Sequence, residues 1–474
     1  MGSNDINYQD QNPAGPANGF SGNMNPEPIK QKKKFPVLPV SIGVGVVALI
    51  AIIAVVLLKS GLFMTDQQKV FLAVSNTLSE DPVLAPFSSI TKVTESDAAT
   101  VDLSMKMDPL SMTVTSAADT GKGQFSLDGT VEYYGTNVAF KGLLDDTSLR
   151  LALPDINNKV LEYDYTRDNN GFLKEQLEAS YGPGALDHIN KMLSSYVSIL
   201  KKSQALHKNF EKKMGKALEG VKTKKTGSKD CQIGGKDQSC DEYTMTLTEN
   251  NIRDIVEAYF DAENETCGQE MKDIQEALEA LGADSSSMDM DQMKDQILSQ
   301  INMKDTDIHF YIKDNKLAAL DTEYEGSKVK MEFRGGDRRT SDILLTVGEG
   351  DSAASISKTD ELSGKEDKGS ISVDGEPVLD YTYNTDSGKF TISHQEEDYF
   401  GDVQSTEISG ILKGSPDGLQ FAIDSMDESF DMDLKLKEGA RIEALTGDVF
   451  DLGNASQEDV TNVFEEISEA FGQY

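Results

Sequence analysis

Two short motifs in the sequence have the residue types of an acylating serine site. Ser355 and Lys358 match the pattern S-x-x-K, and Lys225-Thr226-Gly227 matches K-T-G. In enzymes that carry both motifs, the serine attacks a carbonyl carbon and is activated by basic groups beside it. Here K-T-G comes first, no S-D-N lies between the two motifs, and both lie in strand-like or loop-like sequence. The order and the context therefore argue against this chemistry.

Other catalytic patterns are also missing from the sequence. It contains no G-x-S-x-G, no H-E-x-x-H and no phosphate-binding loop. The acidic, turn-rich stretch from Asp164 to Gly171 does not fit an EF-hand, because Leu177 would stand where the bidentate glutamate belongs. A solvated loop or a calcium site of another type remain the alternatives there. Carboxylates are too numerous for one acid–base pair to be chosen. We therefore expect a non-enzymatic protein with no catalytic residues, cofactor or metal.

The three cysteines suggest a cross-link in a β-hairpin. Cys231 and Cys240 flank QIGGKDQS, in which Gly234-Gly235 is a turn signal, and strand-like YTMTLT follows. A disulfide between them would stabilise the fold by about 2 to 3 kcal/mol. Two free thiols are the alternative, and a metal site is disfavoured because no C-x-x-C is present. Cys267 is then left buried and free, or paired between molecules.

A basic stretch stands out in an otherwise acidic chain. The chain has 45 basic and 81 acidic residues, a formal charge of −36, which argues against nucleic-acid binding. Ten lysines fall between 201 and 229. They either form the wet face of a long helix, or dock on the acidic remainder of the chain, on anionic wall polymer or on lipid headgroups. The ten residues are Lys201, Lys202, Lys208, Lys212, Lys213, Lys216, Lys222, Lys224, Lys225 and Lys229.

One uncharged segment predicts where the protein is located. Residues 37–58 would form a helix of roughly 33 Å, which is long enough to cross a hydrocarbon core of about 30 Å. Four lysines between 30 and 34 precede it, so the amino terminus is expected in the cytoplasm and the rest outside the cell membrane. A cleavable signal peptide is the alternative, but the apolar core is longer than usual and no A-x-A site follows it.

The remaining chain alternates between two periodicities. Residues 66–80 read as a helix with a capping box, Thr65 with Gln68. Alternating strands follow to about 153, then a helical block that includes 171–219, 249–263, 269–281 and 288–302. The hairpin at 222–248 interrupts that block. Strands return from 308, with a polar connection at 349–370 that we expect to be mobile, and a last helix is capped by Ser456. This order predicts an α+β fold with a curved antiparallel sheet packed on a central helical block, after one transmembrane helix.

Four segments follow from these patterns: a disordered cytoplasmic tail (1–34), a transmembrane signal anchor (35–60), and two halves of an ectodomain (65–303 and 304–474). The lysine-plus-anchor start and DCQIGGKDQSCDEYTMTLT before a helix resemble uncharacterised membrane-anchored ectodomain proteins of clostridial-type Gram-positive bacteria. The element order is also similar to half-barrel lipoprotein carriers of the LolA and LppX kind, which hold acyl chains. Neither resemblance carries functional residues over to this chain. The anchor, the half-buried sheets and the missing catalytic motifs predict a non-enzymatic extracytoplasmic binding or interaction module, for a lipid-like or envelope ligand. The alternatives are an envelope enzyme acting on wall or lipid, and an envelope sensor. The sequence does not fix the oligomeric state.

Overall fold

A computed structural model describes residues 65–90, 93, 96–283, 285, 289–324, 326–350, 353–397, 403–416, 418–424 and 430–472. The predicted cytoplasmic tail and the predicted membrane segment at 37–58 lie outside these ranges. Within them, no helix has both the length and the apolar character that a membrane crossing requires. The prediction of a transmembrane anchor therefore stays a prediction.

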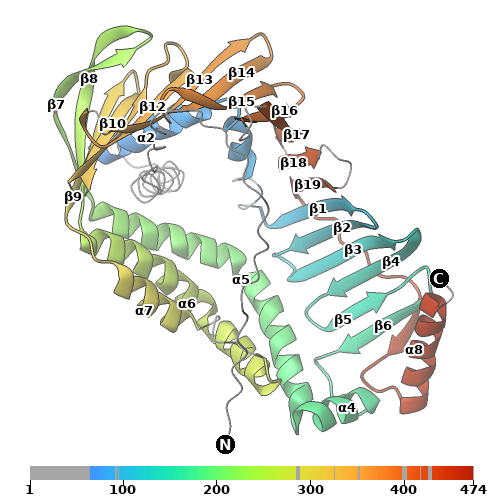
Figure 1. Cartoon of the computed structure of the whole chain (residues 1–474). Helices are drawn as coiled ribbons and strands as arrows, with labels where there is room; N and C mark the ends of the chain where they lie inside the picture. Colours follow the sequence, from blue (N-terminus) through green and yellow to red (C-terminus); the bar gives the residue numbers. More distant parts are fainter. Residues whose placement is uncertain are drawn as a thin grey trace, which may run out of the picture. The chain divides into compact units, whose positions relative to one another are not determined.

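The described strands form one curved sheet (Figure 1). Its hydrogen-bonded order runs from β7 through β19 in chain order, then from β1 to β6, and ends at β20. Neighbouring strands are antiparallel except for β6 and β20, which are parallel. The first ten strands are β1 (Ala98–Met107), β2 (Leu110–Asp119), β3 (Gln124–Tyr133), β4 (Thr136–Leu144), β5 (Ser148–Ala152), β6 (Lys159–Asp164), β7 (Lys222–Ile233), β8 (Lys236–Leu247), β9 (Thr306–Lys313) and β10 (Lys316–Tyr324). The others are β11 (Ser327–Phe333), β12 (Asp342–Val347), β13 (Ala354–Ser363), β14 (Glu366–Val373), β15 (Glu376–Asn384), β16 (Lys389–Glu397), β17 (Val403–Ser415), β18 (Gly418–Asp424), β19 (Phe430–Glu438) and β20 (Asp448–Asp451).

Helices pack against both ends of the sheet. They are α2 (Asp66–Ser79), α4 (Phe172–Tyr181), α5 (Ala185–Glu219), α6 (Glu249–Ala280), α7 (Met290–Gln300) and α8 (Gln457–Gly472), with short 3-10 turns η1 (Ala85–Ser89) and η3 (Arg339–Ser341). Helix α2 packs on the β7–β10 end, where Phe71 and Phe310 share one core with Leu218 of α5. At its amino-terminal end α5 packs on β6, through Leu186 and Tyr163. One helix therefore contacts both ends of the sheet, and the predicted α+β class with a curved, mostly antiparallel sheet is confirmed.

Local signals in the sequence placed several elements correctly. Thr65 caps α2 in the predicted capping box, with Gln68 as its partner. The hairpin of β7 and β8 turns at Gly234 and Gly235, whose φ angles of +58° and +73° suit glycine. The last helix begins after Ser456, whose hydroxyl accepts a hydrogen bond from the Asp459 amide at 3.2 Å. These predictions are confirmed.

Two predictions of local structure were wrong. Residues 249–263 and 269–281 form the single helix α6, because Cys267 is buried and Glu265 pairs with Lys213 of α5 at 2.7 Å. This packing overrides the weak helix propensity around Gly268. Most of the polar stretch 349–370 is strand β13 and the start of β14 rather than a mobile connection. Lys358 pairs with Asp81 and Asp360, and Asp367 pairs with Arg338, which allows these few charges of the stretch to be buried.

Strands from both predicted halves of the ectodomain lie in this one sheet. The predicted boundary between residues 303 and 304 falls between α7 and β9. Hydrogen bonds join β8 to β9 and β19 to β1 across it. The two halves therefore share a sheet, and the boundary marks a change in element order along the chain.

Two buried tyrosines make stability sensitive to alkaline pH. Burial raises the pKa of Tyr163 and of Tyr165 from 10.0 to about 12. The folded state holds each phenolic proton more tightly, so this contribution is fully present below pH 10 and is lost as the pH rises to 12. Over that pH interval the free energy of unfolding should fall in both proteins. The fall should be about 2 to 3 kcal/mol smaller in Tyr163→Phe than in the wild type.

Urea denaturation of both proteins at each pH measures this difference. Tyr133→Phe is the matched control, because its side chain is 56% exposed. Its curve should follow that of the wild type. Parallel curves for Tyr163→Phe and the wild type would contradict the prediction.

Candidate functional site

The two motifs of the serine chemistry do not come together. Ser355 and Lys358 lie three residues apart on β13, so their side chains point to opposite faces of the sheet. Lys358 faces the same side as its cross-strand partners Ile343 and Ile371. Lys225 is at the far edge of the sheet in β7, where it pairs with Asp241 at 2.8 Å. The geometry gives the serine no basic partner from these motifs.

Cys231 and Cys240 both lie on the predicted hairpin, and both are buried. Cys231 stands opposite Gln238, so the two cysteines are diagonal neighbours on adjacent strands, and their side chains interact. That interaction, with burial, raises the pKa of Cys231, whereas the pKa of Cys240 is lowered by Cys231. No disulfide is at bonding distance among the described residues, so the cross-link stays a prediction. Cys267 is a third buried thiol, in α6.

The ten lysines divide into two groups. One group pairs with acidic residues of other elements: Lys201 with Asp146, Lys202 with Glu270, Lys213 with Glu265, Lys225 with Asp241, and Lys229 with Asp321. The second group is exposed, and no ion pair is found for it within the described ranges: Lys208, Lys212, Lys216, Lys222 and Lys224. The first group of lysines thus forms ion pairs with acidic residues elsewhere in the same chain. In the other, Lys222 and Lys224 lie on edge strand β7, where charge discourages pairing with another sheet.

An apolar pocket of about 410 Å³ lies on one face of strands β12 to β18, beside the segment that follows α2. Its floor comes from alternate residues of these strands, which point to the same face. Val83 and Leu84, just before η1, form part of its wall. The apolar and aromatic lining residues are Val83, Leu84, Ile343, Ile371, Leu379, Tyr381, Tyr383, Phe390, Ile392, Leu412 and Phe421. The volume and lining are typical of a site for an apolar ligand.

Aromatic rings lie over glycines on the floor of this pocket. Tyr381 stands opposite Gly369, and Phe390 stands opposite Gly410. A Cβ atom at Gly369 would lie 2.6 Å from the Tyr381 ring, and one at Gly410 would lie 2.7 Å from the Phe390 ring. Neither contact is sterically allowed. Each ring therefore occupies the space that a side chain on the neighbouring strand would take.

A buried ionic network lies beside the pocket. The Lys358 ammonium contacts Asp81 at 2.6 Å and also Asp360. The Arg338 guanidinium contacts Asp360 and, at 2.8 Å, Asp367. The side chains of Asp360 and Asp367 are 0% exposed. Two cations thus compensate three carboxylates, as charges removed from water require.

Tyr381 connects the network to the pocket. Its hydroxyl donates a hydrogen bond to Asp360 at 2.9 Å, while its ring lines the cavity. Burial raises the pKa of Tyr381, and the negative charges of Asp367 and Asp81 raise it further, so the hydroxyl stays protonated. Arg338 Nη1 and Asp367 Oδ2 have no hydrogen-bond partner within the described ranges. Unpaired buried polar atoms cost stability, and where they persist they call for an explanation such as a functional role.

Asp81 fixes the segment that covers this end of the pocket. One carboxylate oxygen accepts hydrogen bonds from the amides of Val83 at 3.0 Å and Leu84 at 3.2 Å. The other contacts Lys358. Residues before η1 are therefore tied to β13 by a side chain that is itself buried.

A second apolar pocket, of about 340 Å³, lies between β3–β6 and α8. Leu127, Leu151 and Leu161 line it from the strands, and Phe464 and Ile467 line it from α8. Here too a ring lies over a glycine, because a Cβ at Gly129 would lie 2.6 Å from the Phe140 ring. The two apolar pockets thus share a construction.

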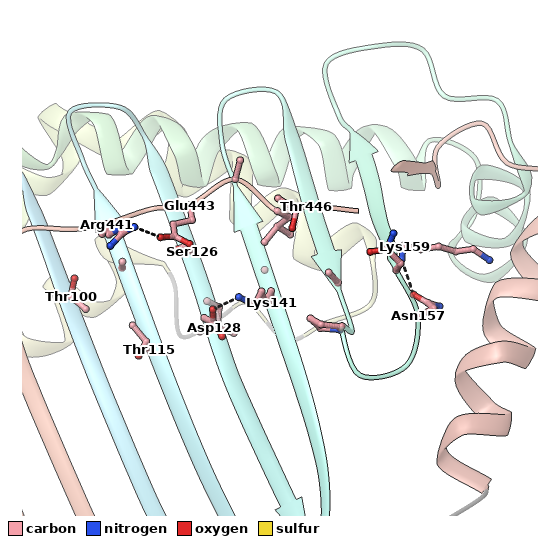
Figure 2. A pocket seen from close by; sticks show the side chains of 18 residues that line it. Thr100, Thr115, Ser126, Asp128, Lys141, Asn157, Lys159, Arg441, Glu443 and Thr446 are labelled. Carbon is pink, nitrogen blue, oxygen red and sulfur yellow. Dashed lines mark hydrogen bonds and ion pairs between the residues drawn. The ribbon is translucent and has the colours of Figure 1, made fainter. Parts of the chain in front are cut away.

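The recess of about 570 Å³ in Figure 2 differs in character. Thr115, Asp128 and Lys141 stand in register on β2, β3 and β4, one residue out of phase with the apolar face. The charges are paired within the recess, Asp128 with Lys141 and Arg441 with Glu443, both at 2.8 Å. The hydrogen bond to Asp128 raises the pKa of Lys141. Such exposed pairs contribute at most about 1 kcal/mol to stability. The recess is lined by a mixture of polar and apolar residues, whereas the lining of the 410 Å³ pocket is mainly apolar.

Sequence reasoning missed the apolar pocket and its ionic network. Lys358, Asp360 and Asp367 all fall in the stretch expected to be a mobile connection. A signal was present, since Ile356, Lys358 and Asp360 alternate with smaller polar residues at the period of a strand.

The acidic loop at 164–171, considered for calcium, uses its side chains in turns: Asp164 accepts hydrogen bonds from Thr166, and Asn169 donates to the Asp164 carbonyl. No group of three metal-ligating side chains occurs in the described part of the chain.

The fold and the pocket define an α+β protein with an apolar site on an antiparallel sheet. No protein-family model matches the chain, and no curated protein matches its sequence. Among solved structures, the S. cerevisiae core factor matches with 7% sequence identity and a TM-score of 0.12. That match covers 80% of this chain and 64% of the other, which is less than two thirds of its length. At this TM-score the match supports no conclusion about fold or function.

Proposed function

We propose that this protein is a membrane-anchored, extracytoplasmic, non-enzymatic binding module for a lipid-like ligand, whose hydrocarbon chain enters the 410 Å³ pocket. The observation that carries the proposal is the apolar floor of that pocket on a sheet face that helices cover only in part. Burying apolar surface releases about 25 cal/mol per Å². The charged groups beside the pocket are paired with one another, which favours binding over catalysis.

The predicted anchor would place this pocket near a membrane. Helix α2 spans Asp66–Ser79. Val83 and Leu84, shortly after its end, form part of the pocket wall. The seven residue-to-residue steps from Leu58 to Thr65 can span at most about 25 Å. A signal anchor at 37–58 with a cytoplasmic amino terminus would then keep the start of α2 close to the outer membrane surface. The similarity of the element order to half-barrel lipoprotein carriers agrees with this proposal.

A fluorescent fatty acid, cis-parinaric acid, tests the proposal by titration into the purified full chain. We expect saturable binding that weakens at least about tenfold in Ile392→Glu, because a carboxylate in the pocket is costly to bury. Thr391→Glu is the matched control, because it places the same charge on the opposite face of β16. Its affinity should stay within about twofold of the wild type, well under the 1.4 kcal/mol of a tenfold change.

Thermal unfolding of each variant shows whether it is folded. Absence of saturable binding to the wild type would reject the proposal. Equal affinities of the wild type and a folded Ile392→Glu would place the ligand elsewhere.

A further inference from the structure

Aligned apolar side chains connect the two apolar pockets across the sheet. Cross-strand partners in the hydrogen-bonded register form one row, which passes through Phe421, Leu434, Leu103, Val114, Gly129 and Phe140. Phe421 lines the 410 Å³ pocket and Phe140 lines the 340 Å³ pocket. A second row beside it passes through Leu436, Val101, Ser116 and Leu127. The pockets are therefore two ends of one apolar band.

The middle of this band is partly exposed in the part of the chain that the structure describes. Leu434, Leu103 and Val114 are only half-buried, although they face the same side as the pocket floors. Further along the same face, Met107 is 48% exposed and Tyr133 is 56% exposed. Exposed apolar side chains grouped on one sheet face mark a candidate binding surface.

The chemistry of the band favours a hydrocarbon. Ser116 is the one polar side chain in the two rows from β18 to β3. An added peptide strand would need a free sheet edge, but β18, β19, β1, β2, β3 and β4 are each paired on both sides. A hydrocarbon chain needs no hydrogen-bond partner, so it can lie on such a surface without leaving a polar group unsatisfied.

The length of the band sets the length of the ligand. Six strands lie from β18 to β4, which at a spacing of about 4.8 Å extend over roughly 24 Å. One leaflet of a bilayer has a hydrocarbon thickness of about 15 Å, half of the usual 30 Å. We propose that the two pockets and the band between them form one site for a single long linear hydrocarbon chain of a membrane lipid, lying across the strands. This inference rests on the function proposed above and specifies the ligand class.

Chain length and stoichiometry test the inference. Octanoic acid should occupy the pockets separately, with two molecules per protein, whereas tetracosanoic acid should bind once, as counted by native mass spectrometry of the full chain. Leu103→Asn should weaken tetracosanoic acid binding at least about tenfold and leave octanoic acid binding unchanged, because Leu103 lies outside both apolar pockets. Ser104→Asn, on the opposite face of β1, should change neither.

The outcomes separate the two proposals. Tetracosanoic acid binding that is equal in Leu103→Asn and the wild type, or two long chains per protein, would overturn the single-chain site while the lipid-binding function stands. Failure of both acids to bind the wild type would remove both proposals. Val114→Asn repeats the test on β2 if Leu103→Asn does not fold.

Discussion

Replacing Arg338 with Met is expected to lower the free energy of unfolding by about 3 to 5 kcal/mol. The guanidinium contacts Asp360 and Asp367, whose side chains are 0% exposed. The methionine side chain fills similar space but carries no charge. Asp367 would then remain in the interior without a cation, and Asp360 would keep only Lys358. An uncompensated buried carboxylate is costly, whereas the intact pair is close to neutral in energy.

Urea denaturation of the full chain at neutral pH measures this effect. Lys365→Met is the matched control, since Lys365 pairs with Asp386 in a neighbouring turn and both side chains are more than half exposed. Its loss should not exceed about 1 kcal/mol, because solvent screens exposed ion pairs. Similar losses in the two variants would show that the network beside the pocket is solvated rather than buried.

Phe310→Ala is expected to destabilise the protein by about 3 to 5 kcal/mol. Phe310 is fully buried in the core that α2, α5 and the sheet share. Its neighbours on β8 and β10, Tyr243 and Leu320, are also buried and fixed in register, so the cavity left by the ring cannot close. Both the lost transfer free energy and the cavity contribute to the cost.

Thermal and urea unfolding of Phe310→Ala check this prediction against Phe464→Ala. The Phe464 side chain is 55% exposed on α8, so its removal should cost less than about 1 kcal/mol. A loss below about 1.5 kcal/mol for Phe310→Ala would mean that the core around β9 rearranges to fill the space.

The sequence was informative where local periodicity determined the element. Alternation in β1, β3 and β19 identified strands with one apolar face, and caps at Thr65 and Ser456 located helix starts. It failed where packing determined the element, as for α6, which continues through Gly268 because it lies along α5. The register of the strands could not be predicted from the sequence either, since the pairing of β19 with β1 joins residues more than 300 positions apart.

The site was harder to predict than the fold. Asp81, Lys358 and Asp367 are scattered over almost 300 residues, and each one alone resembles an ordinary surface charge. Only the sheet brings them together. The same holds for the apolar band, whose rows exist because β18, β19 and β1 align their apolar residues in register. A single sequence contains the alternation within each strand but not the order of the strands.

Gly129, Gly369 and Gly410 have a consequence for engineering. Glycine weakens a strand, and replacing it with alanine is a common way to stiffen a backbone that does not need glycine's freedom. None of the three has a positive φ, so a rule based on torsion angles alone would select them for replacement. The added methyl group would instead collide with an aromatic ring and push it into the cavity above. Thermostabilisation of this sheet should therefore begin at other positions.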